Sequence, residues 1–217
     1  QSAYDGPYLK HKFGKMFHLF MEDVAAQRNS MSGKFFAGLP TYRGQFDAAG
    51  RPLDRGGAYP FALITYKEPF GGQSRTISNY WSNIALQNEN FIVMHKRDAQ
   101  RLGLRPGQKA RLVSASNPEG RARINDDIFI DVVAPVKAVE GMRPGVVGLS
   151  WHYGHWAYGS RDVEVDGQLV RGDRRRAAGA CPNPVMTVDP ILKDVCLTDP
   201  VGGSSSFYDT MVAVQPV

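Results

Sequence analysis

The sequence predicts a mainly β domain, a barrel more than a regular sandwich, that follows an irregular N-terminal extension. From Tyr59 onward the chain contains short apolar runs, most of them four to six residues long and rich in β-branched and aromatic residues. Gly and Pro separate these runs, and the connections between them are long and irregular, which favours a barrel. The predicted strands are Phe61–Tyr66, Phe91–Met94, Ala110–Ala115, Ile128–Val133, Val146–Leu149, Val185–Val188 and Met211–Val214.

The first part of the chain has a different character. Apolar residues at helical spacing predict a helix over Lys15–Ala26, and several Gly- and Pro-containing turns follow it. This part is rich in phenylalanine, whereas disordered chains are poor in aromatic residues. We therefore expect residues 1–58 to be a connector that packs on a larger body, and residues 59–217 to be the β domain. Because the sequence does not begin with Met, we expect it to be a piece of a longer protein.

Composition limits the possible partners. The 217 residues carry a net charge of +5, and the pI is about 9.2. A small basic excess favours anionic partners. No predicted helix has the basic residues together on one face, as nucleic-acid binding would require. No apolar run reaches the length of a membrane span. The two cysteines, Cys181 and Cys196, form no CxxC pair, so neither an iron–sulfur cluster nor a zinc site is expected within this chain.

The stretch Asn90–Val113 predicts a strand, a short helix, a turn and another strand. The apolar run ends at His95-Lys96-Arg97-Asp98, and the predicted short helix, Ala99–Leu104, follows. An imidazole, a carboxylate and two cations therefore lie at one strand end, where a charged ligand could bind. A second predicted helical piece is Pro190–Val195.

Other polar segments have both a structural and a ligand-binding interpretation. Thr65-Tyr66-Lys67 ends the first predicted strand, and Ser74–Asn83 is dense in hydrogen-bonding groups. The aromatic segment Trp151–Trp156 is either a packed loop or a platform for a flat heterocycle. Its His152 and His155 resemble half of a metal site without a third ligand. The basic cluster Arg174–Arg176 is either a solvated loop or a surface that faces an anion.

Taken in order, these segments resemble one family. LITYK (63–67), SRT (74–76), NFIVMHKRDAQRLGLRPGQKARL (90–112), GMRPGVVGLSWHYGHW (141–156), CPNPVM (181–186) and GGSSSFYDTMVAV (202–214) are similar to the C-terminal domain of molybdopterin-dependent oxidoreductases of the dimethyl-sulfoxide-reductase family. GLPTYRGQFDAAGRPL (38–53) resembles the segment that leads into that domain. Within the family, TYK, SNPEG (116–120) and the C-terminal strand look most like tetrathionate reductase catalytic subunits, with arsenate and polysulfide or thiosulfate reductases as alternatives.

The resemblance implies a double-psi β-barrel, of the aspartate-decarboxylase-like kind, that covers one side of a bis(molybdopterin guanine dinucleotide) cofactor. It implies no catalytic residue and no protein ligand of the metal within this chain. Family members often have Asn-Pro where this chain has His95-Lys96, so the role of His95 departs from the family pattern. The implied cofactor-binding residues are Thr65, Tyr66, Lys67, Arg75, Thr76, His95, Asp98, Trp151, His152, Tyr153, Asn183 and Tyr208.

The resemblance also implies partners and a location. The metal, molybdenum or tungsten, and an iron–sulfur cluster would be held by upstream parts of the catalytic subunit, so this chain would be inactive alone. A membrane-anchor subunit, with an iron–sulfur electron-transfer subunit, would complete the enzyme. The assembly would lie in the periplasm or on the outer face of the cytoplasmic membrane, without membrane insertion of this chain. The alternatives are a non-catalytic β-barrel interaction module and a stand-alone hydrolase or self-processing decarboxylase.

Overall fold

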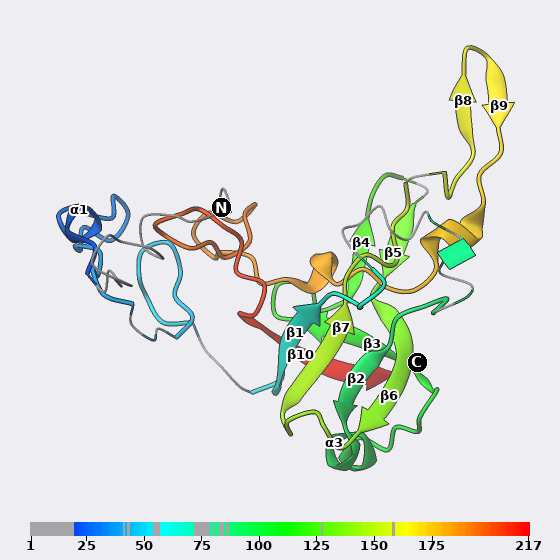
Figure 1. Ribbon diagram of the computed structural model, residues 1–217, viewed down its shortest axis with the longest axis horizontal. Helices are drawn as coiled ribbons and strands as arrows, with labels where there is room; N and C mark the ends of the chain where they lie inside the picture. The colour runs from blue at the N-terminus through cyan, green and yellow to red at the C-terminus, as the bar shows by residue number, and fades with distance from the viewer. Residues whose placement is uncertain are drawn as a thin grey trace, which may run out of the picture. The chain divides into compact units, whose positions relative to one another are not determined.

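The computed structural model describes residues 20–40, 42, 44–53, 57–71, 79, 81–82, 85, 87–126, 128–157 and 159–217. They form two compact units: one combines the described residues up to Leu53 with Asp189–Ser205, and the other combines Asp54–Val188 with Ser206–Val217. The elements, drawn in Figure 1, are α1 (Glu22–Ala25), β1 (Phe61–Tyr66), β2 (Ile92–His95), α3 (Lys96–Arg101), β3 (Lys109–Ser114), β4 (Arg121–Arg123), β5 (Phe129–Asp131), β6 (Val133–Val139), β7 (Val146–Ser150), β8 (Val163–Val165), β9 (Gln168–Val170), η2 (Arg174–Ala177), η3 (Asn183–Val185) and β10 (Thr210–Pro216).

The first unit consists mainly of turns. Of the helix predicted over Lys15–Ala26, the described part is helical only in the four residues of α1. The helical piece predicted at Pro190–Val195 is wrong, because the segment forms turns instead. The carboxylate of Asp189 stabilises these turns by accepting hydrogen bonds from the backbone N–H groups of Ile191 and Leu192, at 2.8 and 3.1 Å.

The second unit is built on a closed six-stranded barrel with the strand order β1-β10-β3-β6-β2-β7. Two of the strand pairs, β1–β7 and β2–β6, are parallel, and the other four are antiparallel. Closure leaves no unpaired sheet edge in the barrel. The predicted mainly β fold and its barrel are confirmed.

Alternation along the strands builds the core. In β1, Phe61, Leu63 and Thr65 are buried while the residues between them are partly exposed. β10 repeats this alternation with Thr210, Val212 and Val214. Since successive side chains of a strand point to opposite faces, one face of each strand fills the barrel. The core is therefore apolar except for a few hydroxyl groups, which belong to Thr65, Ser114, Ser150 and Thr210.

A capping histidine and a glycine define the two ends of α3, the helix at one end of the barrel. The side chain of His95 caps α3, because its Nδ1 accepts a hydrogen bond from the backbone N–H of Arg97 at 3.0 Å. The helix ends at Gly103, whose φ of 67° lets Leu104 donate its N–H back to the carbonyl of Ala99 at 2.9 Å. Local sequence therefore sets both boundaries of this helix.

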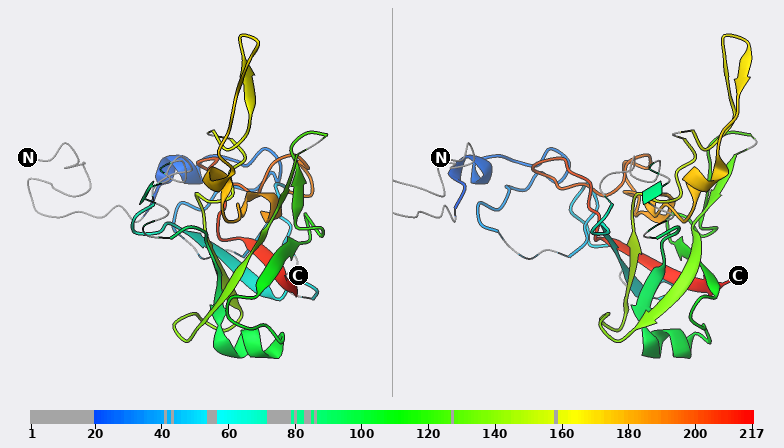
Figure 2. Two further views of the ribbon diagram at one scale, coloured as in Figure 1. Left: turned by 90° about the vertical axis from the view of Figure 1, so that its right-hand side faces the viewer. Right: turned by 45° about the vertical axis from the view of Figure 1, so that its right-hand side comes forward.

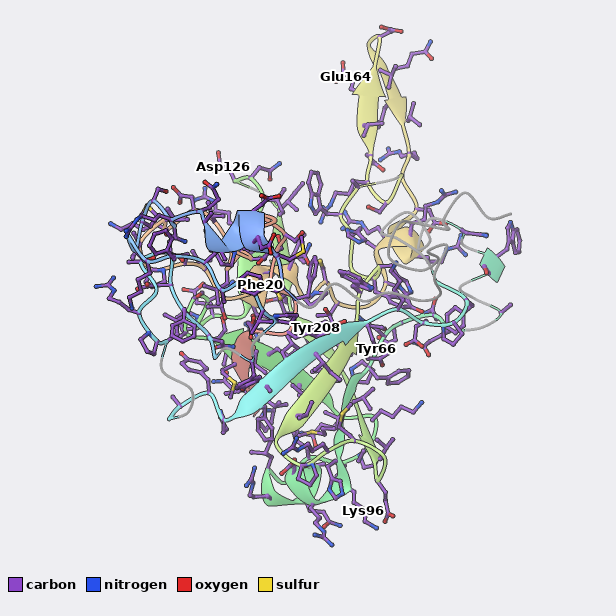
Figure 3. The ribbon with its side chains drawn as sticks, turned by 60° about the vertical axis from the view of Figure 1, so that its left-hand side comes forward. Phe20, Tyr66, Lys96, Asp126, Glu164 and Tyr208 are labelled. Carbon is purple, nitrogen blue, oxygen red and sulfur yellow. The ribbon has the colours of Figure 1, made fainter. Side chains whose placement is uncertain are left out.

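Strand directions define two opposite ends of the barrel. We call one the α3 end: it holds the end of β2, α3 and the start of β7. The other is the β1–β7 end, where these two parallel strands finish and where β2 begins. Figure 3 shows Tyr66 at the β1–β7 end and Lys96 at the α3 end, and both views of Figure 2 also show α3 beyond the far end of the barrel.

Two short hairpins lie outside the barrel, and of their four strands the sequence predicted only β5, within the run Ile128–Val133. β4 pairs with β5, and β8 pairs with β9. The β8–β9 turn, Asp166-Gly167, has φ values of 51° and 75°, as a type I′ turn requires. The strand predicted at Val185–Val188 is wrong, because the 3₁₀ turn η3, with Pro182 at its N-cap and Pro184 within it, ends at Val185 and no strand follows there.

Candidate functional site

The β1–β7 end brings together two groups of predicted site residues. The backbone N–H of Trp151 donates to the carbonyl of Tyr66 at 3.1 Å, which extends the β1–β7 pairing beyond β7. Thr65–Lys67 and Trp151–Tyr153 therefore lie beside each other. The fold thus joins segments that are more than 80 residues apart in the sequence.

Among the residues that the structure describes, several buried polar atoms at this end have no hydrogen-bond partner. They are Thr65 Oγ1, Trp151 Nε1 and both imidazole nitrogens of His152. An unpaired buried polar group costs about 1–3 kcal/mol, so such groups normally have partners. Several at the ends of two adjacent strands indicate a site whose partners come from a ligand.

His152 is held in a constrained position. Its side chain is 3% exposed, and its φ of 78° lies in the left-handed region that favours glycine. A Cβ atom added to Gly71 would lie 2.3 Å from Nε2 of His152, so only glycine leaves room for the ring. Burial lowers the pKa of His152 below its usual range, with Glu68 opposing this shift and His155 adding to it. The neutral ring offers one donor and one acceptor at neutral pH.

Two tyrosines beside His152 are also kept neutral. Burial, assisted by the charge of Glu68, raises the pKa of Tyr66 to about 12 and that of Tyr153 to about 12. The Tyr153 hydroxyl donates to the carbonyl of Gln87 at 3.1 Å, and Gln87 Nε2 donates to Glu68 at 3.3 Å. The sequence prediction missed Glu68, although it directly follows the predicted Thr65-Tyr66-Lys67 segment. Glu68 is a negative charge that acts on three aromatic side chains at this end.

Trp151 provides a flat, partly exposed surface. Its ring packs edge-to-face on Phe207, with 4.9 Å between the ring centroids and 76° between the planes. The ammonium group of Lys67 lies 5.9 Å from the Trp151 ring centroid. Tyr208 follows Phe207 and is 66% exposed. Phe207 therefore brings the C-terminal turn to the same end of the barrel as Trp151.

Asn90 connects the segments that carry the site. Its side chain is fully buried and donates to the carbonyls of Ser150 and Ala180, at 2.6 and 2.8 Å. Its carbonyl oxygen accepts the N–H of Ala180 at 2.8 Å. The sequence prediction missed this role, because one asparagine before a strand carries no signal of its distant partners.

The Ala180 segment leads to the predicted residue Asn183. Asn183 is exposed, and its backbone N–H lies against the thiol of Cys181, whose pKa burial raises. A few residues further on, Thr187 donates from its N–H to Thr210 Oγ1 at 2.9 Å, at the start of β10. Through Ala180, Asn90 thus also anchors the loop that presents Asn183.

His95 and Asp98 lie at the α3 end, away from the other predicted residues. Asp98 accepts a hydrogen bond from the N–H of Gly145 at 2.7 Å and forms an ion pair with Arg101 at 3.2 Å. Both residues therefore have structural roles at the helix corner. Their predicted cofactor contact stays a prediction, although the antiparallel course of β2 and β7 places Asp98 at the other end of the barrel from Thr65 and Trp151.

Some predicted residues cannot be located. Arg75 and Thr76 lie outside the described residues, as does most of the polar segment Ser74–Asn83. In the part of the chain that the structure describes, no three His, Cys, Asp or Glu side chains are grouped as metal ligands would be. Nor does any helix among the described residues have the length and apolar character needed to cross a membrane.

The chemistry of the β1–β7 end fits a flat, polar, anionic cofactor. An indole N–H, two hydroxyls and an imidazole can supply hydrogen bonds to the edge of a heterocycle. Lys67 adds a cation that could approach a phosphate. A pterin dinucleotide requires these donors and a cation, so the residues present fit such a group.

Comparison with known proteins gives a consistent result. A family model described as the molydopterin dinucleotide binding domain matches residues 61–194. A selenate reductase subunit of Mesobacillus selenatarsenatis is 46% identical over 215 residues, which are 99% of this chain and 20% of that protein. A tetrathionate reductase subunit of Salmonella typhimurium is 26% identical over 192 residues, 87% of this chain and 17% of that protein.

A third relative is the molybdopterin-containing subunit of the arsenate respiratory reductase of Shewanella sp. It is 27% identical over 123 residues, 52% of this chain and 13% of that protein. The chain thus spans about a fifth or less of the length of these relatives. The family model covers most of the barrel and the loops at its β1–β7 end. The chain therefore belongs to the molybdopterin dinucleotide-binding domain family and, with it, to the dimethyl-sulfoxide-reductase family.

Proposed function

We propose that this chain is the cofactor-covering domain of a molybdopterin oxidoreductase catalytic subunit, and that its β1–β7 end binds bis(molybdopterin guanine dinucleotide). One observation carries the proposal: within the described part of the chain, buried polar atoms of Thr65, Trp151 and His152 have no hydrogen-bond partner at this end. A ligand with a polar edge would complete their hydrogen bonds and remove the cost of leaving them unpaired. Family membership, through the match to residues 61–194, supports a pterin dinucleotide as that ligand.

The individual residues would contribute in different ways. When bound, the cofactor supplies a metal, molybdenum or tungsten, that exchanges electrons with the substrate. Trp151 would contact the cofactor through its ring and its Nε1–H. The neutral His152 would donate a hydrogen bond from one nitrogen and accept one at the other. Tyr66 and Tyr153 would stay protonated because burial raises the pKa of each to about 12.

Other predicted residues complete the proposed site. Lys67, Tyr208 and Asn183 are exposed and would reach the polar parts of the cofactor. Arg75 and Thr76 remain proposed phosphate contacts. We assign the α3 corner a structural role rather than a cofactor contact, since Asp98 is already paired with Gly145 and Arg101. His95 likewise already caps α3.

Cofactor content of the complete subunit tests this assignment. We expect Trp151→Leu and His152→Ala to lower the molybdenum and guanosine monophosphate content per polypeptide by at least about tenfold, the effect of losing roughly 1.4 kcal/mol of binding. Lys109→Ala is the matched control, since Lys109 is an exposed lysine at the start of β3 that the proposal does not place in the site. Metal analysis and nucleotide release from purified protein give the measurement. Wild-type content in both site variants would refute the assignment.

We further propose that the complete enzyme reduces an oxyanion or a related sulfur compound, with selenate as the first candidate. The support is the 46% identity to a protein named as part of a selenate reductase, across 99% of this chain. Tetrathionate, which the sequence motifs favoured, ranks second, because the relatives with that name share less identity. Arsenate is a further alternative through the relative from the arsenate respiratory reductase.

Turnover by the complete, cofactor-loaded enzyme tests the substrate. Reduced viologen dye would supply electrons, and dye oxidation would be measured with selenate, tetrathionate and arsenate. We expect the largest kcat/KM with selenate. A larger value with tetrathionate or arsenate would replace selenate as the substrate. No oxidation with any of them, in protein that contains molybdenum, would refute the proposed substrate class.

The proposed assembly contains the rest of the catalytic subunit with its iron–sulfur cluster, a membrane anchor and an electron-transfer subunit. We place it outside the cytoplasmic membrane, in line with the family resemblance. Cells would be separated into periplasmic, membrane and cytoplasmic fractions, and the complete subunit would be purified from the fraction that contains it. This tests both the location and the partner subunits. A subunit recovered from the cytoplasm without iron–sulfur partners would contradict them.

A further inference from the structure

Two adjacent residues at the base of the β8–β9 hairpin have buried donors that the cofactor assignment does not use. Ser160 is 1% exposed, and its hydroxyl oxygen has no hydrogen-bond partner in the described part of the chain. The same holds for the buried Nε atom of Arg161. A buried guanidinium N–H that lacks an acceptor is especially costly, because its charge strengthens the need for one.

The backbone around these residues packs tightly. Asp173 donates its N–H to the carbonyl of Gly159 at 2.8 Å, which holds the two sides of the hairpin base together. A Cβ atom at Gly172 would lie 2.2–2.4 Å from the backbone of Arg161, so a glycine is required at that crossing. A Cβ atom at Gly159 would lie 3.7 Å from Nη1 of Arg176. Arg176 is thus brought next to the residue that precedes Ser160.

Positive charge dominates the hairpin base. The carboxylate of Asp162 is engaged by Arg171 at 2.6 Å, and that of Asp173 by Arg175 at 2.8 Å. Arg161, Arg174 and Arg176 come in addition to these two ion pairs. The other acidic residues of the hairpin are Glu164 in β8 and Asp166 in the turn, and Figure 3 shows Glu164 far from the base. The base therefore has a local excess of guanidinium groups.

We propose that Ser160, Arg161 and Arg176 form an anion-binding site for a tetrahedral oxyanion. A hydroxyl and two guanidinium groups can all donate hydrogen bonds, and an oxyanion offers several acceptor oxygens in a compact volume. The two buried donors, on Ser160 and Arg161, are satisfied only when such an acceptor binds. The oxyanion is either a free selenate-like ion or a phosphate group of a nucleotide. The nucleotide alternative rests on the proposed function, whereas the free-oxyanion alternative requires only an anion.

The test uses the 217-residue chain with sodium selenate and with guanosine diphosphate as probes, and with sodium chloride at matched ionic strength as the blank. Isothermal titration calorimetry measures affinity, and thermal unfolding measures stabilisation by the anion. The variants are Arg161→Gln, Arg161→Lys and Ser160→Ala. Arg105→Gln is the matched control, because it removes an exposed positive charge at the α3 end.

We expect Arg161→Gln to weaken anion binding about tenfold or more, the usual effect of losing one charged hydrogen bond. Arg161→Lys should also weaken it, because lysine keeps the charge but lacks the planar Nε–H donor. Arg105→Gln should change the affinity less than about twofold, because salt screens the effect of an exposed charge that is far from the site. Equal losses in Arg105→Gln and Arg161→Gln would refute the site, because they would show unspecific charge attraction.

Ser160→Ala separates binding from folding. Without an anion, this variant should unfold at the same or a higher temperature than wild type, because it removes a buried hydroxyl that has no partner. Addition of the anion should stabilise wild type but not the variant. Destabilisation of the anion-free variant would contradict the proposal, since it would mean that the hydroxyl already has a partner within the chain.

The two probes distinguish the sources of the oxyanion. Arg161-dependent binding of selenate supports a site for a free oxyanion. Arg161-dependent binding of guanosine diphosphate, without selenate binding, supports a site for a nucleotide phosphate. Binding of neither probe at millimolar concentration refutes the proposal. Molybdenum content of the complete subunit is measured separately, so failure here does not decide the cofactor assignment.

Discussion

At the α3 end of the barrel, the buried carboxylate of Asp98 accepts the N–H of Gly145 and pairs with Arg101, and the imidazole of His95 caps a helix. At the β1–β7 end, neither imidazole nitrogen of the buried His152 has a hydrogen-bond partner among the described residues, and neither does the indole N–H of Trp151. Both ends carry a histidine next to other polar groups. Only the hydrogen-bond partners tell them apart.

This difference shows how to separate a structural corner from a binding site. Where buried polar groups are paired within the chain, the fold itself explains them. Where they are unpaired, the free energy of the folded chain carries a cost that a ligand can offset. Variants at each end can test whether the two ends of the barrel really differ in this way.

The largest effect is expected for Asn90, which holds the β1–β7 end. Asn90→Ala removes three hydrogen bonds and leaves backbone groups of Ser150 and Ala180 unpaired. The free energy of unfolding in urea should fall by about 3 kcal/mol. Asn88→Ala, at an exposed position, is the control and should change it by less than about 0.5 kcal/mol. A loss below about 1 kcal/mol in Asn90→Ala would show that these loops hold their positions without it.

Asp98 should affect stability and leave cofactor binding unchanged. Asp98→Ala leaves the partly buried N–H of Gly145 without its acceptor and removes a buried carboxylate, so we expect a loss of about 2 kcal/mol in urea unfolding. Asp98→Asn keeps an acceptor oxygen and should lose less. The molybdenum content of the complete subunit should match wild type in both variants. Stable variants that lost the cofactor would return the nucleotide contact to the α3 end and overturn the comparison.

His152 should make stability depend on pH. Its pKa is lowered in the folded chain, so on acidification the unfolded chain binds a proton before the folded chain does. Stability should therefore be fully present above the ordinary histidine pKa of about 6.5 and fall as the pH drops below it. In urea unfolding from about pH 7.5 to about pH 5, His152→Asn should show a shallower fall than wild type. Some dependence should remain, because burial lowers the pKa of His155 as well. Identical pH profiles would mean that His152 is not buried in its neutral form.

The smallest effect is expected for Lys67 above the Trp151 ring. Lys67→Met should cost about 0.5 kcal/mol of stability, as an exposed cation–π contact does. Lys137→Met is a matched control, because the Lys137 ammonium lies 5.7 Å from the Phe91 ring centroid in a similar contact. Both variants should lose similar stability, but only Lys67→Met should weaken binding of guanosine diphosphate by the chain. Equal binding by the two variants would remove Lys67 from the site.

Local sequence was sufficient for most of the barrel. Five of the barrel strands lie within one or two residues of the predicted runs, because the apolar pattern of each run by itself indicates a strand. These are β1, β2, β3, β7 and β10. Two proline residues prevented a strand at Val185–Val188. The β8–β9 hairpin was missed, although Asp166-Gly167 between two triplets with two apolar residues each is a recognised hairpin signal.

The candidate site was only partly predictable. Residue type and motif position indicated Tyr66, Lys67, Trp151 and His152, and the fold places these at one end of the barrel. The same reasoning put Asp98 with them, because sequence order does not state whether two strands run parallel or antiparallel. Glu68 and Asn90 were missed, since their importance lies in contacts with residues that are distant in the sequence.

The sequence alone was enough to establish the mainly β fold, the family resemblance, the helix corner at His95–Asp98 and the lack of a CxxC pair. These depend on local patterns of apolar, turn and capping residues, which act over a few positions. The tertiary structure was needed to decide which polar groups share an end of the barrel and which of them lack a partner. Strand direction and burial set both properties, and each arises from pairing between segments that lie far apart along the chain.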